Sequence, residues 1–462
     1  MISPSLKVAL GTALALIFVA LGMLFWRSGS ARAYAPASYD AGARKLQLPL
    51  RLSADRRRLL DGAGAPFLIH GEAAWSLIAQ LRDDEVAAYL ADRRARGINL
   101  VMVNLVEHKY ADHAPRDAAG QAPFLAPGDF ARPNDAYFRR ADQTIRRAGE
   151  AGMVVLLCPA YLGYDGEDEG WYREMRAAGP AVMRGYGRYV GQRYASFDNV
   201  VWLEGGDFTP PAEGVALVNA VAAGIREKDP RHLHAAHWGP ETSGADLPAA
   251  VDAGWLDLNT TYTYRAVYQK SAADDRHPTH LPHVLIESAY EDAPDHPSTP
   301  RAMRAQAYAA LLTGATGQIY GHNEVWKFSP AWQKSLASPG AISMTHLRAL
   351  FESRNWSELA FDRENQILVG GQGDNGSLDY ALLAATRDGR LAITYLPRVR
   401  DVVIDLARLN GPLRARWYDP TTGRFSDAAP GVLPAQGRQK FRPARKNAVG
   451  DPDWVLVLEG AG

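Results

Sequence analysis

Eight short apolar runs, most of them followed by an amphipathic stretch, restrict what this chain can fold into. The runs are residues 66–70, 98–106, 153–161, 199–204, 232–238, 256–264, 283–287 and 317–322. The helix-like stretches are residues 83–96, 136–151, 181–194, 212–227, 301–312 and 343–351. Strands that alternate with helices indicate parallel βαβ units. Eight such strands suit a closed barrel, whose typical size is ~250 residues.

We therefore predict an α/β fold, a (β/α)8 TIM barrel, over residues 53–358. The rival is an open doubly wound sheet, which normally carries a glycine-rich phosphate-binding turn after its first strand. The sequence after the first apolar run, HGEAAW at residues 70–75, is not such a turn.

The pattern changes near residue 360, where helix-like stretches stop and short strand-like runs recur up to the C-terminus. Turn signals such as Asp388-Gly389 and Asn410-Gly411 separate these runs. Regularly spaced short strands without helices are typical of a sandwich. The sequence therefore predicts a C-terminal all-β sandwich domain over residues 359–462.

The N-terminal segment predicts the location of the protein. Residues 8–26 carry no charged side chain, and the run is long enough to span a bilayer. Ala31-Arg32-Ala33 also matches the small-x-small pattern of a signal-peptidase site. We predict a membrane anchor or signal segment over residues 1–33, with an uncleaved anchor favoured, and a linker over residues 34–52. Either reading places the catalytic domain outside the cytoplasm, in the cell envelope or secreted.

Charge and cysteine content exclude several functions. Lys plus Arg and Asp plus Glu both total 51, so the chain lacks the basic surplus typical of nucleic-acid binding. The one cysteine, Cys158, excludes an intramolecular disulfide and a cysteine-based metal site. Its apolar surroundings favour a buried packing residue. We predict no nucleic-acid partner and no cofactor, and the oligomeric state stays open.

Polar and aromatic residues stand at nearly every predicted strand end, where barrel enzymes place their active groups. This set indicates a cleft for a polar, ring-shaped ligand, and carboxylates facing each other across a barrel mouth can hydrolyse a glycosidic bond. Histidines near four strand ends leave metal-dependent hydrolysis as an alternative, although their spacing matches no metal motif. The predicted substrate-binding residues are Glu72, Trp75, Asn104, Glu204, His237, Tyr262, Tyr290, His322 and Trp326.

The segment VVWLEGGDFTPP at residues 200–211 offers two carboxylates, Glu204 and Asp207. Glu204 ends the predicted strand, and the Gly205-Gly206 pair permits a bend that other residues resist. Asp207 would then emerge above the strand end, facing the cleft. Glu287 ends another apolar strand, HVLIE, where an unpaired buried carboxylate would be costly without a role.

Several ordered stretches make the chain resemble the apiosidase-like glycoside hydrolases, barrel enzymes often followed by a domain of the collagen-binding type. They include DGAGAPFLIHGEAAWSL, RRARGINLVMVNLVE, FDNVVWLEGGD, HVLIESAYE, GQIYGHNEVW and RARWYDPTTGRF. The resemblance implies that Asp207 is the acid/base and Glu287 the nucleophile. The best-described activity of the family removes apiose from plant pectin.

The chain departs from the family pattern at two carboxylates. The family has Gly-Asp where this chain has Gly71-Glu72, and an apolar or small residue at the position of Glu204. We predict an exported or membrane-anchored, retaining glycoside hydrolase that acts on a plant or microbial polysaccharide. A non-catalytic carbohydrate-binding or matrix-associated protein and a metal-dependent barrel hydrolase remain alternatives.

Overall fold

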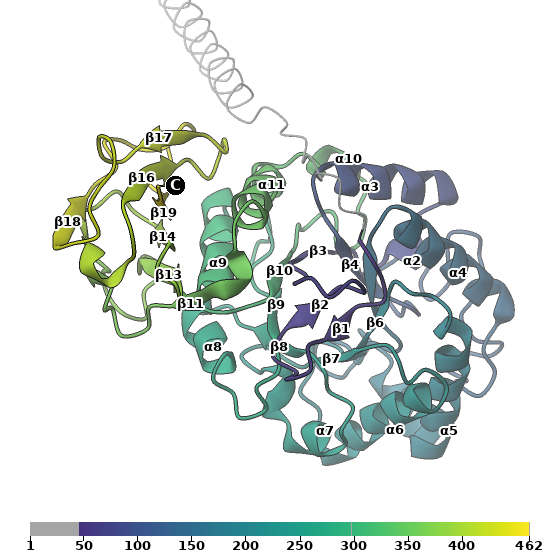
Figure 1. Ribbon diagram of the computed structural model, residues 1–462. Helices are drawn as coiled ribbons and strands as arrows, with labels where there is room; N and C mark the ends of the chain where they lie inside the picture. Colours follow the sequence, from purple (N-terminus) through teal and green to yellow (C-terminus); the bar gives the residue numbers. More distant parts are fainter. Residues whose placement is uncertain (1–45, 297, 462) are drawn as a thin grey trace, which may run out of the picture.

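A computed structural model describes residues 46–296 and 298–461 of the chain (Figure 1). The predicted anchor or signal segment, residues 1–33, lies outside the described residues. Within the described part of the chain, no helix has the length and apolarity needed to cross a membrane. The end of the predicted linker is described, and its Leu50 is buried against the barrel core. There β1 (Arg51–Leu52) pairs with β2 (Leu59–Leu60).

Eight parallel strands form the barrel that the sequence predicts. They are β3 (Ile69–Ala73), β4 (Leu100–Asn104), β5 (Val154–Cys158), β6 (Val200–Gly205), β7 (His234–His237), β8 (Asn259–Tyr262), β9 (His283–Glu287) and β10 (Gly317–Tyr320). The strand order is β7-β6-β5-β4-β3-β10-β9-β8, and a parallel bridge between Ala235 and Leu258 joins the two edges. The predicted TIM-like barrel is thereby confirmed.

Helices cover the outside of the barrel (Figure 1). They are α2 (Leu77–Gln80), α3 (Asp83–Ala95), α4 (Asp135–Glu150), α5 (Tyr172–Tyr194), α6 (Ala212–Lys228), α7 (Pro248–Asp252), α8 (Val267–Asp274), α9 (Pro300–Leu312), α10 (Trp332–Ser335) and α11 (Pro339–Glu352). The helices after β7 and β8 are short, which explains why these two connections show a weak helical pattern. Local sequence starts others: Thr299 and Ser338 accept backbone N–H groups at the first turns of α9 and α11, each of which begins with proline.

Strand alternation divides the apolar side chains into two layers. Leu100, Met102, Val201 and Leu203 belong to the cluster inside the barrel. Their neighbours along the same strands, such as Trp202, pack in the cluster shared with the surrounding helices. Both faces of every strand are therefore buried, as parallel strands require.

The C-terminal region consists of antiparallel sheets. Its strands are β11 (Leu359–Phe361), β12 (Leu368–Gly370), β13 (Leu382–Thr386), β14 (Leu391–Leu396), β15 (Val402–Asp405), β16 (Leu413–Tyr418), β17 (Phe425–Asp427), β18 (Arg438–Phe441) and β19 (Trp454–Gly460). A six-stranded sheet runs β11-β13-β14-β19-β16-β17, and a three-stranded sheet runs β12-β15-β18. Side chains of both sheets share one apolar cluster.

The C-terminal sheets are joined to the barrel through α9 and α11, beside which they lie (Figure 1). An apolar cluster continues from these helices into β13, β14, β16 and β19. At its edge, Arg304 of α9 is fully buried and forms a two-pronged ion pair with Asp453, at 2.7 and 2.8 Å. The seam is thus built like a protein core.

Candidate active site

Asp207 leaves β6 through a turn that only its glycines allow. Gly205, Gly206 and Asp207 all have positive φ, at 89°, 131° and 51°. A Cβ on Gly205 would lie 2.5 Å from the carbonyl oxygen of His237, and one on Gly206 would lie 2.3 Å from the ring of Tyr161. A non-glycine residue in this backbone region costs ~1–2 kcal/mol, and Asp207 bears this strain itself. The turn lifts the Asp207 carboxylate over the barrel mouth, beyond the end of the strand.

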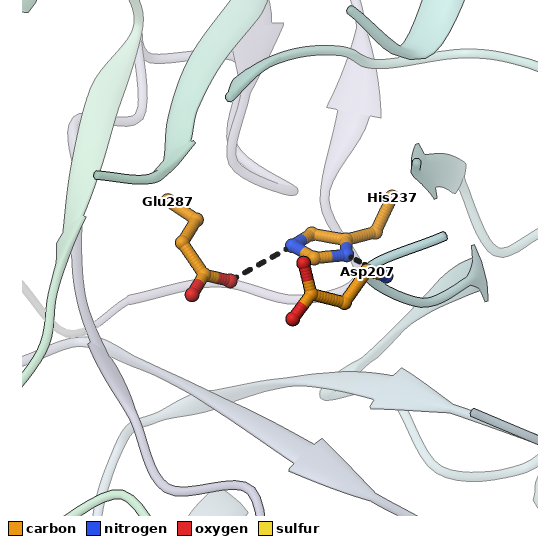
Figure 2. Close-up of side chains that lie close together, drawn as sticks. All are labelled: Asp207, His237 and Glu287. Carbon is orange, nitrogen blue, oxygen red and sulfur yellow. Dashed lines mark hydrogen bonds and ion pairs between the residues drawn. The ribbon is translucent and has the colours of Figure 1, made fainter. Parts of the chain in front are cut away.

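His237 connects Asp207 to Glu287 (Figure 2). The backbone N–H of Asp207 donates to His237 Nδ1 at 2.7 Å, so Nδ1 carries no proton. Burial lowers the pKa of His237 to about 4, which keeps the ring neutral with its proton on Nε2. This Nε2–H then donates to Glu287 Oε2 at 3.0 Å. One imidazole of fixed tautomer therefore touches the backbone of one carboxylate residue and the side chain of the other.

The two carboxylates are close enough to affect each other. Asp207, His237 and Glu287 each present a ligand-type atom within 4.8 Å of those of the other two. Burial, and then the charge of Glu287, raise the pKa of Asp207 to about 7. Burial raises the pKa of Glu287 to about 8. Two coupled carboxyl groups of this kind hold a shared proton near neutral pH.

The donor distances favour Asp207 as the holder of that proton, although burial raises the pKa of Glu287 further. Tyr161 OH lies 3.3 Å from Asp207 Oδ2, whereas the bond from His237 to Glu287 measures 3.0 Å. Glu287 accepts the Nε2–H of His237, and a donated hydrogen bond favours the ionised form of a carboxylate. Oδ1 of Asp207 is buried and has no hydrogen-bond partner among the described residues, which suits a protonated oxygen kept for a substrate. Asp207 is thus the carboxyl group with an oxygen left unpaired in the described chain, and Glu287 the one that accepts from His237.

Tyrosines surround the pair. Tyr161 OH lies 3.3 Å from Asp207 Oδ2, and Tyr262 OH lies 2.8 Å from Tyr264 OH. Trp75 Nε1 donates to Tyr290 OH at 3.3 Å, and the ring of Trp75 lies against those of Tyr161 and His237. Rings with polar tips suit a sugar, which presents apolar faces and hydroxyl edges.

The structure brings together most of the predicted strand-end residues. Asp207, His237 and Glu287 meet directly, while Trp75, Tyr262 and Tyr290 lie around them. Two residues at this site, Tyr161 and Tyr264, are missing from the predicted set. Both end predicted strands, at residues 153–161 and 256–264, so the rule that selected the other residues also points to them.

Glu72 is placed elsewhere. Its carboxylate lies 2.7 Å from Arg93 Nη1 and accepts a 2.5 Å hydrogen bond from Tyr89 OH. Both partners belong to α3, so Glu72 faces the helix layer. The side chains that alternate with it, Ile69 and Ala73, lie in the barrel cluster. Glu72 is therefore part of a buried ion pair that fastens α3 to the barrel.

Glu204 is placed outside the barrel mouth as well. It shares the helix-facing side of β6 with Trp202, and its Oε1 lies 3.0 Å from His234 Nδ1. Burial raises the pKa of Glu204 to about 8, and the charge of Arg226 on α6 opposes that shift. Glu204 does not meet Glu287, so Asp207 is the carboxylate of this segment that faces the nucleophile candidate.

The remaining predicted binding residues form no hydrogen bond with Asp207, His237 or Glu287 in the described chain. Asn104 is buried, and its Oδ1 has no hydrogen-bond partner within the described chain. His322 has both ring nitrogens engaged: Nδ1 accepts from the backbone N–H of Glu324, and Nε2 lies 3.4 Å from Asp292. Trp326 packs edge-on against Tyr110, with the Lys327 ammonium 5.4 Å from its ring centre.

The same three residues could hold a metal ion. Among residues 46–296 and 298–461, the group formed by Asp207, His237 and Glu287 has the spacing of a metal site. An ion would take the place of the Nε2 proton of His237 and bind the two carboxylates. Two carboxylates and one imidazole form a plausible donor set for a divalent cation.

Comparison with known proteins agrees with this geometry. A family model described as "Apiosidase-like, catalytic domain" matches residues 53–358, more than half of the chain. A second model, described as "Putative collagen-binding domain of a collagenase", matches residues 365–459. No curated protein matches the chain.

Solved structures share the fold over most of the chain. A glycoside hydrolase family 5 protein from Bacteroides vulgatus is 23% identical with a TM-score of 0.78, covering 90% of this chain and 95% of that one. A second structure, described as a glycoside hydrolase, is 22% identical with a TM-score of 0.77, covering 89% and 97%. The family model confirms the resemblance inferred from the motifs. The chain therefore belongs to the apiosidase-like glycoside hydrolase family.

Proposed function

We propose that this chain hydrolyses a glycosidic bond with retention of anomeric configuration, with Asp207 as acid/base and Glu287 as nucleophile. The observation that carries the proposal is the spacing of the two carboxylates, whose nearest oxygens lie within 4.8 Å of each other. Retaining enzymes hold their carboxyl groups ~5–5.5 Å apart, whereas inverting enzymes leave ~6.5–9.5 Å for a water molecule.

In the first step, the Glu287 carboxylate attacks the anomeric carbon and the bond to the leaving oxygen breaks. Asp207 gives its proton to that oxygen. In the second step, the Asp207 carboxylate takes a proton from water, which attacks the anomeric carbon and releases Glu287 as a carboxylate. Two inversions restore the starting configuration, and Asp207 ends protonated. His237 donates to Glu287 at the start and end of this cycle.

The substrate proposed for this site is a sugar unit of a plant or microbial polysaccharide. The aromatic rings around the carboxylates support a carbohydrate ligand, with Tyr262 and Tyr290 as contacts within the cleft. The apolar run at residues 8–26 supports an exported or membrane-anchored protein. The two antiparallel sheets that share one apolar cluster support a C-terminal β-sandwich, and their core-like seam with α9 supports a role in stabilising the barrel.

One observation favours a second candidate. Asp207, His237 and Glu287 also suit a metal ion, which would make the chain a metal-dependent barrel hydrolase. Activity against aryl glycosides, measured before and after dialysis with a chelator, separates the two functions. The retaining mechanism predicts unchanged activity, and the metal mechanism predicts loss that a divalent cation restores.

The test of the proposal uses three matched carboxylate-to-amide variants. Glu287→Gln and Asp207→Asn should lose nearly all hydrolysis of a glycoside that the wild type cleaves, whereas Glu204→Gln should keep most of it. Hydrolysis that survives in Glu287→Gln would overturn the assignment. Glycan binding by a wild type that cleaves no member of a broad glycoside panel would favour the non-catalytic alternative.

A further inference from the structure

A groove lies at the opposite end of the barrel from the catalytic residues. Two adjoining hollows form it and share six lining residues: Arg57, Arg58, Asp275, Gly314, Ser357 and Leu359. The lining includes the residues that lead into β9 and β10, whereas Glu287 stands where β9 ends. Because the strands are parallel, the groove opens at the end of the barrel where they begin. It runs along the seam with the C-terminal sheets, where β11 contributes to its wall.

The groove is strongly basic although the chain as a whole is neutral. Its lining holds five guanidinium groups, those of Arg57, Arg58, Arg276, Arg363 and Arg387. It holds two carboxylates, Asp275 and Glu358. The formal net charge of the whole sequence is zero. The positive charge of the groove therefore comes from the placement of these arginines and not from a basic overall composition.

Carboxylates of the described chain offset only part of this charge. Arg58 pairs with Glu358 at 2.9 Å, and Arg363 lies 3.6 Å from Asp275. The guanidinium groups of Arg57, Arg276 and Arg387 form no ion pair within 4.0 Å of a described carboxylate, although the charges of Asp55 and Asp275 act on Arg57 and Arg276. Burial and then the charge of Arg276 lower the pKa of Arg363, so these cations repel one another across the groove. A bound anion would relieve that repulsion.

Aromatic rings accompany the arginines. Trp356 and Phe361 line the groove and are only half-buried. The Arg363 guanidinium lies 5.4 Å from the ring centre of Phe361. Ring faces beside guanidinium groups can hold a sugar ring and its acidic substituent at the same time.

We propose that this groove is a second carbohydrate-binding site, which holds an anionic polysaccharide bearing carboxylate or sulfate groups at the base of the barrel. A polymer held there would keep the enzyme on its substrate material without occupying the cleft. The groove is concave and lined by aromatic rings, which suits a polymer chain better than the flat surface of a membrane. The neutral overall charge gives no support for a nucleic acid. The inference rests on family membership and is independent of the roles assigned to Asp207 and Glu287.

The test measures binding of the whole protein to soluble polymers in affinity gels at low salt. The probes are polygalacturonate for carboxylates, chondroitin sulfate for sulfates, and a neutral glucan. We expect retardation by at least one anionic probe, none by the glucan, and weakening as salt rises. The triple variant Arg57→Gln, Arg276→Gln, Arg387→Gln should bind roughly tenfold more weakly, a change that three lost charge contacts can produce.

A matched control separates the groove from general electrostatics. Arg408→Gln, Arg424→Gln, Arg445→Gln removes the same charge from exposed positions outside the groove and should leave binding unchanged. Equal weakening in both triple variants would overturn the proposal, as would binding of anionic phospholipid vesicles alone. Glu287→Gln should bind the polymers like the wild type, and both triple variants should hydrolyse small aryl glycosides normally. Polymer binding therefore tests the groove, and hydrolysis tests the proposed catalytic pair, so that either proposal can fail without the other.

Discussion

His237 Nε2 lies 3.0 Å from Glu287 Oε2, while Nδ1 of the same ring accepts the backbone N–H of Asp207 at 2.7 Å. The strained turn that carries Asp207 is thereby tied to the end of a strand on the far side of the barrel. The bond to Nδ1 also fixes the tautomer that donates to Glu287. His237 is a positioning residue for both proposed catalytic groups.

Replacing His237 tests this role. His237→Asn keeps an acceptor for the Asp207 N–H but is too short to reach Glu287, so kcat should fall by about 10²-fold with a small change in KM. Loss of the donated hydrogen bond raises the pKa of Glu287, and the acidic limb of kcat/KM should shift to higher pH. His237→Gln has a longer side chain whose amide can donate to Glu287. It should therefore move the acidic limb of kcat/KM part of the way back towards its wild-type pH. If both variants lose activity but neither shifts the acidic limb of kcat/KM, the role of His237 is only structural.

Gly206 tests the turn itself. Gly206→Ala puts a Cβ 2.3 Å from the ring of Tyr161 in a backbone with φ of 131°. The turn must shift, so kcat should fall by about 10²-fold while the protein stays folded, because a small misplacement of a reacting group is costly. Gly152→Ala is the control: its φ of 74° brings similar strain, but no atom lies within 4 Å of the new Cβ. Equal kinetic loss in both variants would contradict the account.

The pH dependence of hydrolysis follows from the raised carboxyl pKa values. The active form holds one proton on the pair, so activity falls in acid when Glu287 is protonated and in base when Asp207 loses its proton. Burial raises the pKa of both carboxyl groups well above their usual range, and the two limbs report the first and second proton of the coupled pair. Activity should therefore peak near neutral pH. The alkaline limb should disappear in Asp207→Asn, measured with an activated dinitrophenyl glycoside whose leaving group needs no proton. An optimum below pH 5, where ordinary carboxyl groups titrate, would show that the pair is not buried as described.

The seam between the barrel and the C-terminal sheets should dominate stability. Asp453→Ala removes the two-pronged partner of the fully buried Arg304 and leaves only Asp451, 2.6 Å from Nη2, to offset its charge. The cost should lie at the lower end of the ~3–5 kcal/mol seen when a buried ion pair is broken. Arg414→Ala breaks an exposed pair with Asp427 and should cost ~0–1 kcal/mol. Denaturant unfolding of both variants measures the difference. A small effect of Asp453→Ala would mean that the two parts unfold independently.

The barrel could be predicted because its evidence is local and repeated. Eight apolar runs of strand length, six of them followed by a helical pattern, have few other solutions. The two runs without one, residues 232–238 and 256–264, precede the short α7 and α8. The location of Asp207 was also readable, since two adjacent glycines before a polar residue signal a turn. The role of His237 was not, because it depends on a contact between three strand ends.

Glu72 and Glu204 show where strand-end reasoning fails. Both stand near strand ends, yet alternation along β3 and β6 turns them towards the helices. Glu204 shares its face with Trp202, a signal present in the sequence that outweighs its position near the mouth. Their partners, Arg93 and His234, lie in other elements of the fold, so sequence alone could not reveal that these carboxylates are already paired.

The stereochemistry of azide transfer tests the central claim most directly. Asp207→Ala should cleave an activated dinitrophenyl glycoside, which needs no proton, and added azide should accelerate the reaction and give a glycosyl azide of retained configuration. Glu287→Ala should instead give the inverted azide, because azide attacks the anomeric carbon from the position of the missing carboxylate in a single displacement. NMR of the anomeric proton distinguishes the two products. Retained azide from Glu287→Ala, or inverted azide from Asp207→Ala, would contradict the assignment of the two carboxylates.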